Sequence, residues 1–507
     1  MAVVAAGHPE TARAGAEAIA RGGNAVDGVV GAAYAAAVAE GLLTGPAAGG
    51  FLLACEPGGR PTLLDFFVAA PGLGPRGRPL DPDRLDSFEV PFGDAEQVFH
   101  IGPASVGVPG MVPGLAEASA RLGRLAAADL VAPAAALARR GVTVTAEVAY
   151  LLEILEAMIT RRPECAAIWA PEGRTPRVGE RILQPELAES LEEIGRSGAA
   201  AIRDGPLARA LVAYLEREGG LVTSEDLLAY RVEERVPLEV GHGEVTVVTN
   251  PPPSSGGVLI AVALRELAGW EGGDVGFYRA VGRAGRAANA YRTAAFAEGI
   301  RDPGYAAALV EGLVSRRPTG TTHVSAVDAE GGMASLSSSN GSGSGVVVPG
   351  TGLFLNNMLG EQDINPGGFG RLAAGVRMTS MMAPTLILRR GEPVLALGSA
   401  GSNRLRSAIL QTVVSIVDCG LGLGAAVARP RVHPEGDGVD VELGVPEEAV
   451  AALEADAHRI RRWGRMNLFF GGVSVAGLGP SGLEGAGDPR RGGAAAGVLA
   501  DGRVVDL

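Results

Sequence analysis

The sequence has 507 residues, of which 47% are hydrophobic and only 20% are charged, and its formal net charge is -13. A chain this acidic lacks the basic face that neutralises phosphates, which argues against a nucleic-acid-binding protein and against binding to anionic membranes. The apolar content excludes an intrinsically disordered chain, and the length suits two or three ordinary domains or one large layered domain.

Cysteine usage and the first residues bear on the cellular compartment. Cys55, Cys165 and Cys419 are far apart in sequence, so they predict neither a disulfide framework nor a metal cluster. The N-terminus shows no basic segment followed by a long apolar run, and no stretch approaches the roughly 18–20 apolar residues of a membrane span. We therefore expect a cytoplasmic protein, although a chain whose leader had been removed would look the same.

The first 300 residues predict mainly helices. A helix at residues 9–21 ends at two glycines, and the next helix, at residues 24–40, is apolar on most sides. Residues 71–101 are rich in Pro, Gly and Asp and predict a surface loop. The remaining elements expected here are strands at 2–6, 51–54 and 245–249 and helices at 124–140, 151–161, 186–203, 258–267 and 278–301.

The pattern changes to mainly strands after residue 320. Residues 322–328 and 333–339 alternate around Glu-Gly-Gly, which predicts a hairpin. The other elements expected are a strand at 353–355, a hairpin at 385–388 and 394–397, a helix at 406–419, and a strand pair near 473–475 and 494–499 that closes the chain.

The segment at residues 318–328 (PTGTTHVSAVD) is the first candidate for chemistry. A hydroxyl at the mouth of a buried strand suits a nucleophile if a base lies within reach. If the peptide bond before Thr321 is cut, the new α-amino group, with a pKa of about 7.7–8.0, supplies that base. Taken alone, Thr-Thr-His is more often an ordinary turn that opens a strand.

Six short segments resemble those of the γ-glutamyltransferase family, in the family's order and over nearly the whole chain. They are residues 23–27 (GNAVD), 252–257 (PPSSGG), 321–323 (TTH), 355–357 (LNN), 398–401 (GSAG) and 488–493 (DPRRGG). The resemblance implies an α/β (α+β) fold of the N-terminal-nucleophile hydrolase type, a four-layer αββα sandwich that spans residues 1–507 as a single domain.

The resemblance also implies self-cleavage between Gly320 and Thr321. Thr321 would then be the nucleophile and, through its freed amine, the base. Residues 1–320 and 321–507 would form a heterodimer of the chain's own two fragments, with or without further dimerisation. No cofactor is implied, and the partners would be a small γ-glutamyl or related amide together with water or an acceptor amine.

Four further residues take catalytic or binding places by the same resemblance. Ser339 falls where the family has a threonine that orients the nucleophile. Gly401 and Ser402 occupy the place of a glycine pair whose backbone N–H groups form the oxyanion hole, where one donor is worth about 3 kcal/mol of barrier lowering. Asn340 lies next to the place of a substrate-binding asparagine.

The residues that bind the glutamyl group in the family are only partly matched here. Phe67 stands at the place of an arginine that binds the α-carboxylate. Arg76, a little downstream, is either its substitute or, as we favour, a surface arginine. Ser380 matches the first residue of a serine pair, Met381 replaces the second, and Glu361 stands where an aspartate is expected. Neither a phenyl ring nor a thioether can donate a hydrogen bond to a carboxylate.

His323 invites a Thr–His dyad, because residues two apart on a strand point to the same face. In the family the base is the freed amine, so we favour a structural or orienting role for this histidine. The other histidines are scattered without ligand spacing, and no metal site is expected.

Three hypotheses follow. The first is a self-processing threonine amidohydrolase or acyltransferase that cleaves γ-glutamyl amides of the glutathione type through an acyl-Thr321 intermediate. The second is an acylase of the same fold acting on a non-glutamyl amide. The third, disfavoured because the candidate catalytic residues occur together, is a non-catalytic binding homologue.

Overall fold

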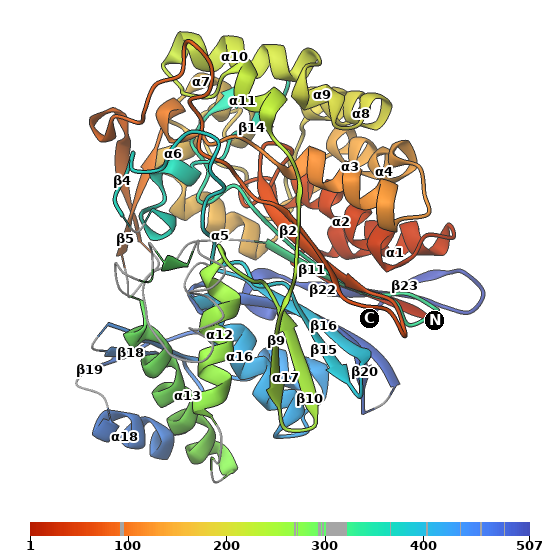
Figure 1. Cartoon of the computed structure of the whole chain (residues 1–507), viewed down its shortest axis with the longest axis vertical. Helices are drawn as coiled ribbons and strands as arrows, with labels where there is room; N and C mark the ends of the chain where they lie inside the picture. Colours follow the sequence, from red (N-terminus) through yellow and green to blue (C-terminus); the bar gives the residue numbers. More distant parts are fainter. Residues whose placement is uncertain are drawn as a thin grey trace.

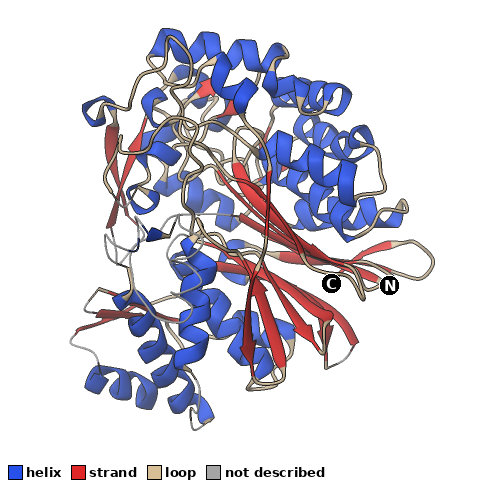
Figure 2. Cartoon of the chain, viewed as in Figure 1, coloured by secondary structure: helices blue, strands red, loops and turns tan. Residues whose placement is uncertain are grey.

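Two large β-sheets pack face to face between two layers of helices in this computed structural model (Figures 1 and 2). The structure describes residues 1–91, 96–267, 270, 272–292, 296, 299–300, 322–365, 367–401, 404–436, 438–456, 459–480 and 482–507. The layer order is helix, sheet, sheet, helix, which confirms the predicted αββα sandwich.

The larger sheet has eight strands in the order β23-β22-β1-β11-β12-β2-β3-β8, each antiparallel to its neighbours. Its strands are β1 (Ala2–Ala6), β2 (Gly49–Cys55), β3 (Thr62–Phe66), β8 (Glu233–Arg235), β11 (Thr322–Val327), β12 (Met333–Ser339), β22 (Ala494–Val498) and β23 (Val504–Asp506).

The smaller sheet has six antiparallel strands in the order β21-β20-β16-β15-β10-β9. They are β9 (Leu238–His242), β10 (Val245–Thr249), β15 (Thr385–Arg389), β16 (Glu392–Ala400), β20 (Gly472–Gly479) and β21 (Gly482–Gly487). Strands from both sides of residue 320 contribute to both sheets, so neither part of the chain completes a sheet by itself.

Helices cover the outer face of each sheet, as the upper and lower layers of Figure 1 show. The helices on the side of the larger sheet are α1 (Pro9–Ala20), α2 (Ala25–Ala39), α3 (Met111–Leu122), α4 (Ala127–Arg140), α8 (Pro185–Ser197), α9 (Ala200–Arg203), α10 (Pro206–Glu218) and α11 (Ser224–Ala229). Those on the side of the smaller sheet are α12 (Ser255–Glu266), α13 (Gly273–Ala290), α16 (Arg404–Val417), α17 (Leu423–Ala428) and α18 (Glu447–Asp456).

The alternation of side chains along the strands builds separate cores. Val4 on β1 and Val324 on β11 point to the helices, whereas Val3 and Val327 point between the sheets. Because both faces of the larger sheet are covered, these strands are apolar or small on both faces.

The second predicted helix is buried along its whole length. Every residue of α2 is buried, and its start is set by a capping box in which Asn24 and Asp27 bond each other's backbone N–H groups. The Asp27 carboxylate also accepts from the backbone N–H groups of Arg124 and Leu125. The Gly-Asn-Ala-Val-Asp segment is therefore a helix start that also fixes a neighbouring loop.

Several predictions about secondary structure were wrong. The helix expected at 278–301 ends at Ala290, with Tyr291 as its C-cap, and the helix expected at 151–161 is interrupted at Leu155. The stretch at 71–101 contains a hairpin, β4 (Asp86–Pro91) with β5 (Glu96–Ile101), which its many turn-forming residues concealed. The strands near 473–475 and 494–499 do not pair with each other. β20 pairs with β16 and β21, and β22 pairs with β1 and β23, so the two lie in different sheets.

Shorter elements lie at the edges of the sandwich. They are β6 (Val142–Thr143), α5 (Ala146–Ile154), α6 (Glu156–Ile159), α7 (Pro163–Trp169), β7 (Arg181–Ile182), β13 (Val347–Val348), β14 (Leu353–Phe354), β17 (Val432–Glu435), β18 (Gly438–Val441) and β19 (Arg459–Arg462). Among the described helices, none combines the length and the hydropathy that crossing a bilayer requires.

Candidate active site

The predicted nucleophile precedes the first described residue of β11. Gly320, Thr321 and Ser402 lie outside the described residues. β11 itself begins at Thr322, as the hairpin prediction requires, and pairs with β12 in a register that sets Thr322 opposite Ser338. Ser339, the predicted orienting residue, is the next residue of β12, is fully buried, and accepts a hydrogen bond from Gly341 N at 2.8 Å.

A cluster of buried polar side chains lies on the face of this hairpin that packs against the smaller sheet. His323 Nδ1 lies 2.8 Å from Ser337 Oγ, and its Nε2 lies 2.9 Å from Ser325 Oγ. Ser325 donates its own proton to the carbonyl oxygen of Ser474, so it accepts from Nε2–H, and Nδ1 accepts from Ser337. Ser335 donates to Leu397 O on β16 at 2.9 Å. The cluster thus joins the two sheets.

His323 is held neutral by this environment. Burial lowers the pKa of His323 to about 3, because the imidazolium would be charged in a site without solvent. Both ring nitrogens already contact serine hydroxyls. This arrangement supports the structural or orienting role that we favoured over a Thr–His dyad.

Gly401 lies where β16 ends and α16 begins. Its φ is +114°, and a Cβ would lie 2.6 Å from Gly471 Cα, so a side chain has neither the conformation nor the space. Its carbonyl accepts from Arg404 N, in the first turn of α16. The N-terminus of a helix carries partial positive charge and unpaired N–H groups, which suits stabilisation of a developing oxyanion.

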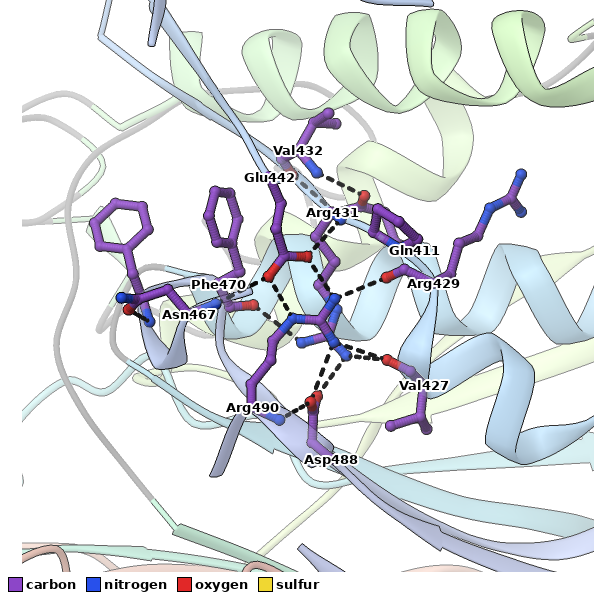
Figure 3. A network of polar contacts seen from close by, with 12 residues as sticks. Gln411, Val427, Arg429, Arg431, Val432, Glu442, Asn467, Phe470, Asp488 and Arg490 are labelled. Atoms are coloured by element: carbon purple, nitrogen blue, oxygen red, sulfur yellow. Dashed lines mark hydrogen bonds and ion pairs between the residues drawn. The ribbon is translucent and has the colours of Figure 1, made fainter. Parts of the chain in front are cut away.

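A buried network of ion pairs and hydrogen bonds joins Arg431 and Arg490 to Glu442 and Asp488 (Figure 3). Arg490 bonds Glu442 through Nε at 2.8 Å and Asp488 through Nη1 at 3.1 Å, and Arg431 bonds Asp488 at 2.6 Å. Burial by itself raises the pKa of Asp488, but the charges of Arg431 and Arg490 hold it below its ordinary value. Asp488 also accepts from Val473 N at 2.9 Å, which ties the network to β20.

The sequence did not reveal this network. Residues 488–493 were noticed only as part of the family resemblance, while Arg431 and Glu442 carry no local motif. Chain connectivity gives no indication that these side chains meet; the fold brings them together.

Two of the predicted substrate-binding residues meet in the turn after β12. Glu361 Oε1 accepts from Ser342 N at 2.7 Å. Asn340 is fully buried, and neither its amide nitrogen nor its amide oxygen has a partner among the described residues. Asn357, from the Leu-Asn-Asn segment, donates to Ser342 Oγ at 2.7 Å. The structure thus brings Ser339, Asn340 and Glu361 into one locality.

Ser380 and Met381 are held by the start of α12. Ser255 N donates to the Ser380 carbonyl at 2.8 Å, and Ser255 Oγ contacts Met381 Sδ at 3.3 Å. A Cβ on Gly256 would lie 1.9 Å from Met381 O. The Pro-Pro-Ser-Ser-Gly-Gly segment therefore allows a close approach of two backbones, a role that sequence reasoning missed.

Phe67 lies in the core between the sheets. Its side chain is 1% exposed and stacks on Phe51 with 5.6 Å between the ring centroids. Arg76 is a surface residue whose side chain is 77% exposed and pairs with Glu216, as favoured from the sequence. The described residues contain no group of His, Cys, Asp and Glu side chains that could hold a metal ion.

Comparison with known proteins supports the resemblance. A family model described as gamma-glutamyltranspeptidase matches residues 11–317 and 286–498. The acylase ACY 1 proenzyme of a Pseudomonas species is 33% identical over 519 residues, which cover 96% of this chain and 91% of that protein. The glutathione hydrolase proenzyme of Escherichia coli is 30% identical over 526 residues, which cover 94% of this chain and 88% of that protein.

The fold is also that of a solved relative. The crystal structure of cephalosporin acylase from Bacillus halodurans matches with a TM-score of 0.81 at 26% identity, covering 97% of this chain and 95% of that one. The family model, the two proenzymes and the shared fold agree over nearly the whole chain. The chain therefore belongs to the gamma-glutamyltranspeptidase family and is an enzyme with the N-terminal-nucleophile hydrolase fold.

Proposed function

We propose that this chain is a proenzyme that cleaves itself between Gly320 and Thr321 and then acts as a threonine amidohydrolase or acyltransferase. In the precursor, the Thr321 hydroxyl attacks the carbonyl of Gly320 to give an ester that water hydrolyses. In the processed enzyme, the same hydroxyl attacks a substrate amide while the freed α-amino group takes up its proton. The amide C–N bond then breaks, the proton passes to the leaving amine, and water or an acceptor amine resolves the acyl-enzyme.

The observation that carries this proposal is the pairing of β11 with β12. The last pair among the described residues is Thr322 with Ser338. The buried Ser339 is the next residue of β12, and Thr321 is the residue before β11 in the sequence. On the facing sheet, Gly401 precedes the N-terminus of α16, and β16 packs against both strands of the hairpin. Together with the backbone N–H of Ser402, it would supply the oxyanion hole.

We propose that the preferred substrate is an amide whose acyl group is bound without the contacts that hold an α-carboxylate in the family. The phenyl ring of Phe67 and the thioether of Met381 stand at two of the clamp positions, and both are 2% exposed or less. Glu361, which would meet the α-amino group, and Ser380 remain buried polar side chains. Similarity to the acylase proenzyme and to cephalosporin acylase supports this choice, while similarity to glutathione hydrolase keeps γ-glutamyl amides as the second candidate.

Self-cleavage is tested on a denaturing gel. The purified chain should give two fragments, the smaller with Thr321 at its N-terminus. Thr321→Ala should leave one chain, and the matched variant Thr321→Ser, which keeps a hydroxyl, should still be cleaved. A wild-type chain that remains intact after long incubation contradicts the proposal.

The acyl group is tested with four anilides that share one leaving group: γ-glutamyl, glutaryl, 4-aminobutanoyl and butanoyl. Removing only the α-carboxylate, as in the 4-aminobutanoyl compound, should change kcat/KM by less than about threefold, because a phenyl ring, that of Phe67, stands at the place of the family's carboxylate-binding arginine. A loss of about a hundredfold would show that a carboxylate clamp exists and would favour the γ-glutamyl alternative.

A further inference from the structure

A small, mostly apolar cavity lies on the helix side of the larger sheet, beside the start of β11. Its volume is about 50 Å³. The walls come from the end of α2, from α5 and α7, and from two short 3-10 helices at Leu468–Phe470 and Pro489–Arg491. Leu43, Leu151, Ile182 and Leu468 are among the apolar residues that line it.

Three nitrogen donors in the wall of this cavity have no partner within the described part of the chain. They are Nε2 of His8, Nε1 of Trp169 and Nε of Arg491, and no described residue accepts a hydrogen bond from any of them. His8 is 6% exposed and Trp169 4%. A buried donor left without an acceptor costs about 1–3 kcal/mol, so three in one cavity require an explanation.

The proton on His8 is assigned by its role in α1. His8 is the N-cap of this helix, and its Nδ1 accepts from Glu10 N at 3.2 Å. Burial lowers the pKa of His8 below its ordinary value, despite the nearby carboxylates of Glu40, Glu10 and Glu147. The neutral ring therefore carries its proton on Nε2, which makes this atom a donor.

Among the described residues, neither of the two carboxylates in the wall, Glu40 and Glu147, accepts from these donors. Glu40 accepts from Thr11 Oγ1 at 2.8 Å through Oε1 and from Thr322 Oγ1 at 2.5 Å through Oε2. The Arg491 side chain donates from Nη2 to Leu468 O at 3.3 Å. The three N–H groups are therefore open to an acceptor oxygen that an occupant of the cavity would bring.

From these contacts we propose that the cavity binds a short-chain molecule with an apolar body and an acceptor oxygen, a small amide or carboxylic acid. The oxygen accepts from the indole, imidazole and guanidinium N–H groups, and the carbon chain packs on the leucine and isoleucine side chains. A cavity of about 150 Å³ holds benzene and a single water needs about 10–15 Å³, so an occupant of about two to four carbons fits here.

This site is separate from the predicted substrate contacts but touches the catalytic strands. Glu40 bonds Thr322, the residue after the proposed nucleophile. A Cβ on Gly401 would lie 3.1 Å from Arg491 Nη2, so this guanidinium stands between the cavity and the proposed oxyanion glycine. Neither contact requires that the chain be cleaved.

The test uses the full chain with its three tryptophans replaced by 5-fluorotryptophan, observed by fluorine NMR. Trp169→Phe assigns the resonance of the cavity tryptophan. Acetamide, propionamide and butyramide form one arm, and acetate, propionate and butyrate form the other. We expect a saturable shift of the Trp169 resonance in at least one arm, with the Trp270 and Trp463 resonances unmoved.

Two variants test whether the N–H groups in the cavity wall bind the ligand that shifts the Trp169 resonance. Trp169→Phe keeps the ring but removes the N–H, and should weaken binding about tenfold in ligand-observed NMR. Trp270→Phe is the matched control and should change the affinity less than twofold. If Trp169→Phe does not fold, His8→Asn, which keeps an N-cap oxygen, should show the same weakening.

Each outcome bears on the proposal. Preference for the amides or for the acids supports the site and identifies the class of occupant. No saturable shift with any of the six compounds means that the cavity holds only water, which overturns the proposal. Repeating the titration with Thr321→Ala separates this result from the proposed function, because binding should persist in a chain that neither cleaves itself nor turns over substrate.

Discussion

The imidazole of His323 occupies the space that a side chain at Gly398 would need. A Cβ on Gly398 would lie 2.3 Å from His323 Cε1 and 2.5 Å from its Nδ1. His323 belongs to β11 and Gly398 to β16, so this contact sets the distance between the strand that follows the proposed nucleophile and the strand that leads to Gly401.

Gly398→Ala should therefore destabilise the protein. The added methyl group has to displace a buried ring, and overpacking of this kind costs about 1–3 kcal/mol. The measurement is urea unfolding in a Thr321→Ala background, which keeps the chain whole. The control is Gly241→Ala, in β9 of the same sheet, where a Cβ meets nothing within 4 Å and where we expect a change below about 0.5 kcal/mol.

A double variant tests the cause. In a His323→Ala background the imidazole ring is absent, so Gly398→Ala should lower the free energy of unfolding by less than it does in the presence of His323. Equal costs in both backgrounds would show that the two residues do not interact.

The neutral state of His323 predicts a pH dependence of stability. Its pKa is about 3 in the folded protein and about 6.5 in the unfolded chain, so the unfolded state binds the extra proton between these values. The contribution is fully present above pH 6.5 and is lost as the pH falls toward 3. At pH 5 it lowers the stability of the wild type by about 2 kcal/mol relative to pH 7.

His323→Asn removes this titration. The difference in unfolding free energy between wild type and His323→Asn should shrink by about 2 kcal/mol from pH 7 to pH 5. A difference that stays constant over this range would mean that the ring is protonated in the folded protein.

Ser339→Ala tests the proposed orientation of the nucleophile. Loss of the hydroxyl should lower kcat/KM about 10- to 100-fold on the best anilide, and Ser339→Thr, which keeps it, should retain most of the activity. The control is Ser338→Ala, whose hydroxyl contacts Thr44 Oγ1 on the helix side of the sheet and should leave kcat nearly unchanged. Full activity of Ser339→Ala would remove this residue from the site.

Arg490→Met tests the ion network of Figure 3. Removal of the guanidinium leaves Glu442 and Asp488 buried with too little positive charge, which should cost about 3–5 kcal/mol in urea unfolding. Arg76→Met is the matched control, because its pair with Glu216 is exposed and worth at most about 1 kcal/mol. Similar costs for both variants would contradict the burial argument.

Local patterns were enough to predict most strands and helices. The helix start at Asn24, the hairpin at Thr322–Val327 and Met333–Ser339, and the buried strand before the three prolines were all found as expected. The hairpin at Asp86–Pro91 and Glu96–Ile101 was missed because Pro, Gly and Asp dominate its surroundings, and local propensity then outweighs pairing that only the partner strand reveals.

The candidate site divides in the same way. Ser339 and Gly401 could be named from the sequence, because they fall at catalytic positions of the family that the sequence resembles. The environment of the Phe67 side chain could not be predicted from the sequence, since a position in a motif does not say toward which core a side chain points. His8, Trp169 and Arg491 are far apart in sequence and share a cavity only after folding.

By itself, the sequence determined the order of the main elements, because periodicity, capping and turn residues act over a few neighbours. Its six short motifs carried the resemblance from which the family and the proposed cleavage site were inferred. Only the tertiary structure decided which strands share a sheet and which buried charges pair. It also decided that His323 rests on Gly398, and that three donors meet in one apolar cavity. These contacts join residues far apart in the chain. Burial increases the contribution of each contact to stability, since a polar group removed from water must find its partner within the fold.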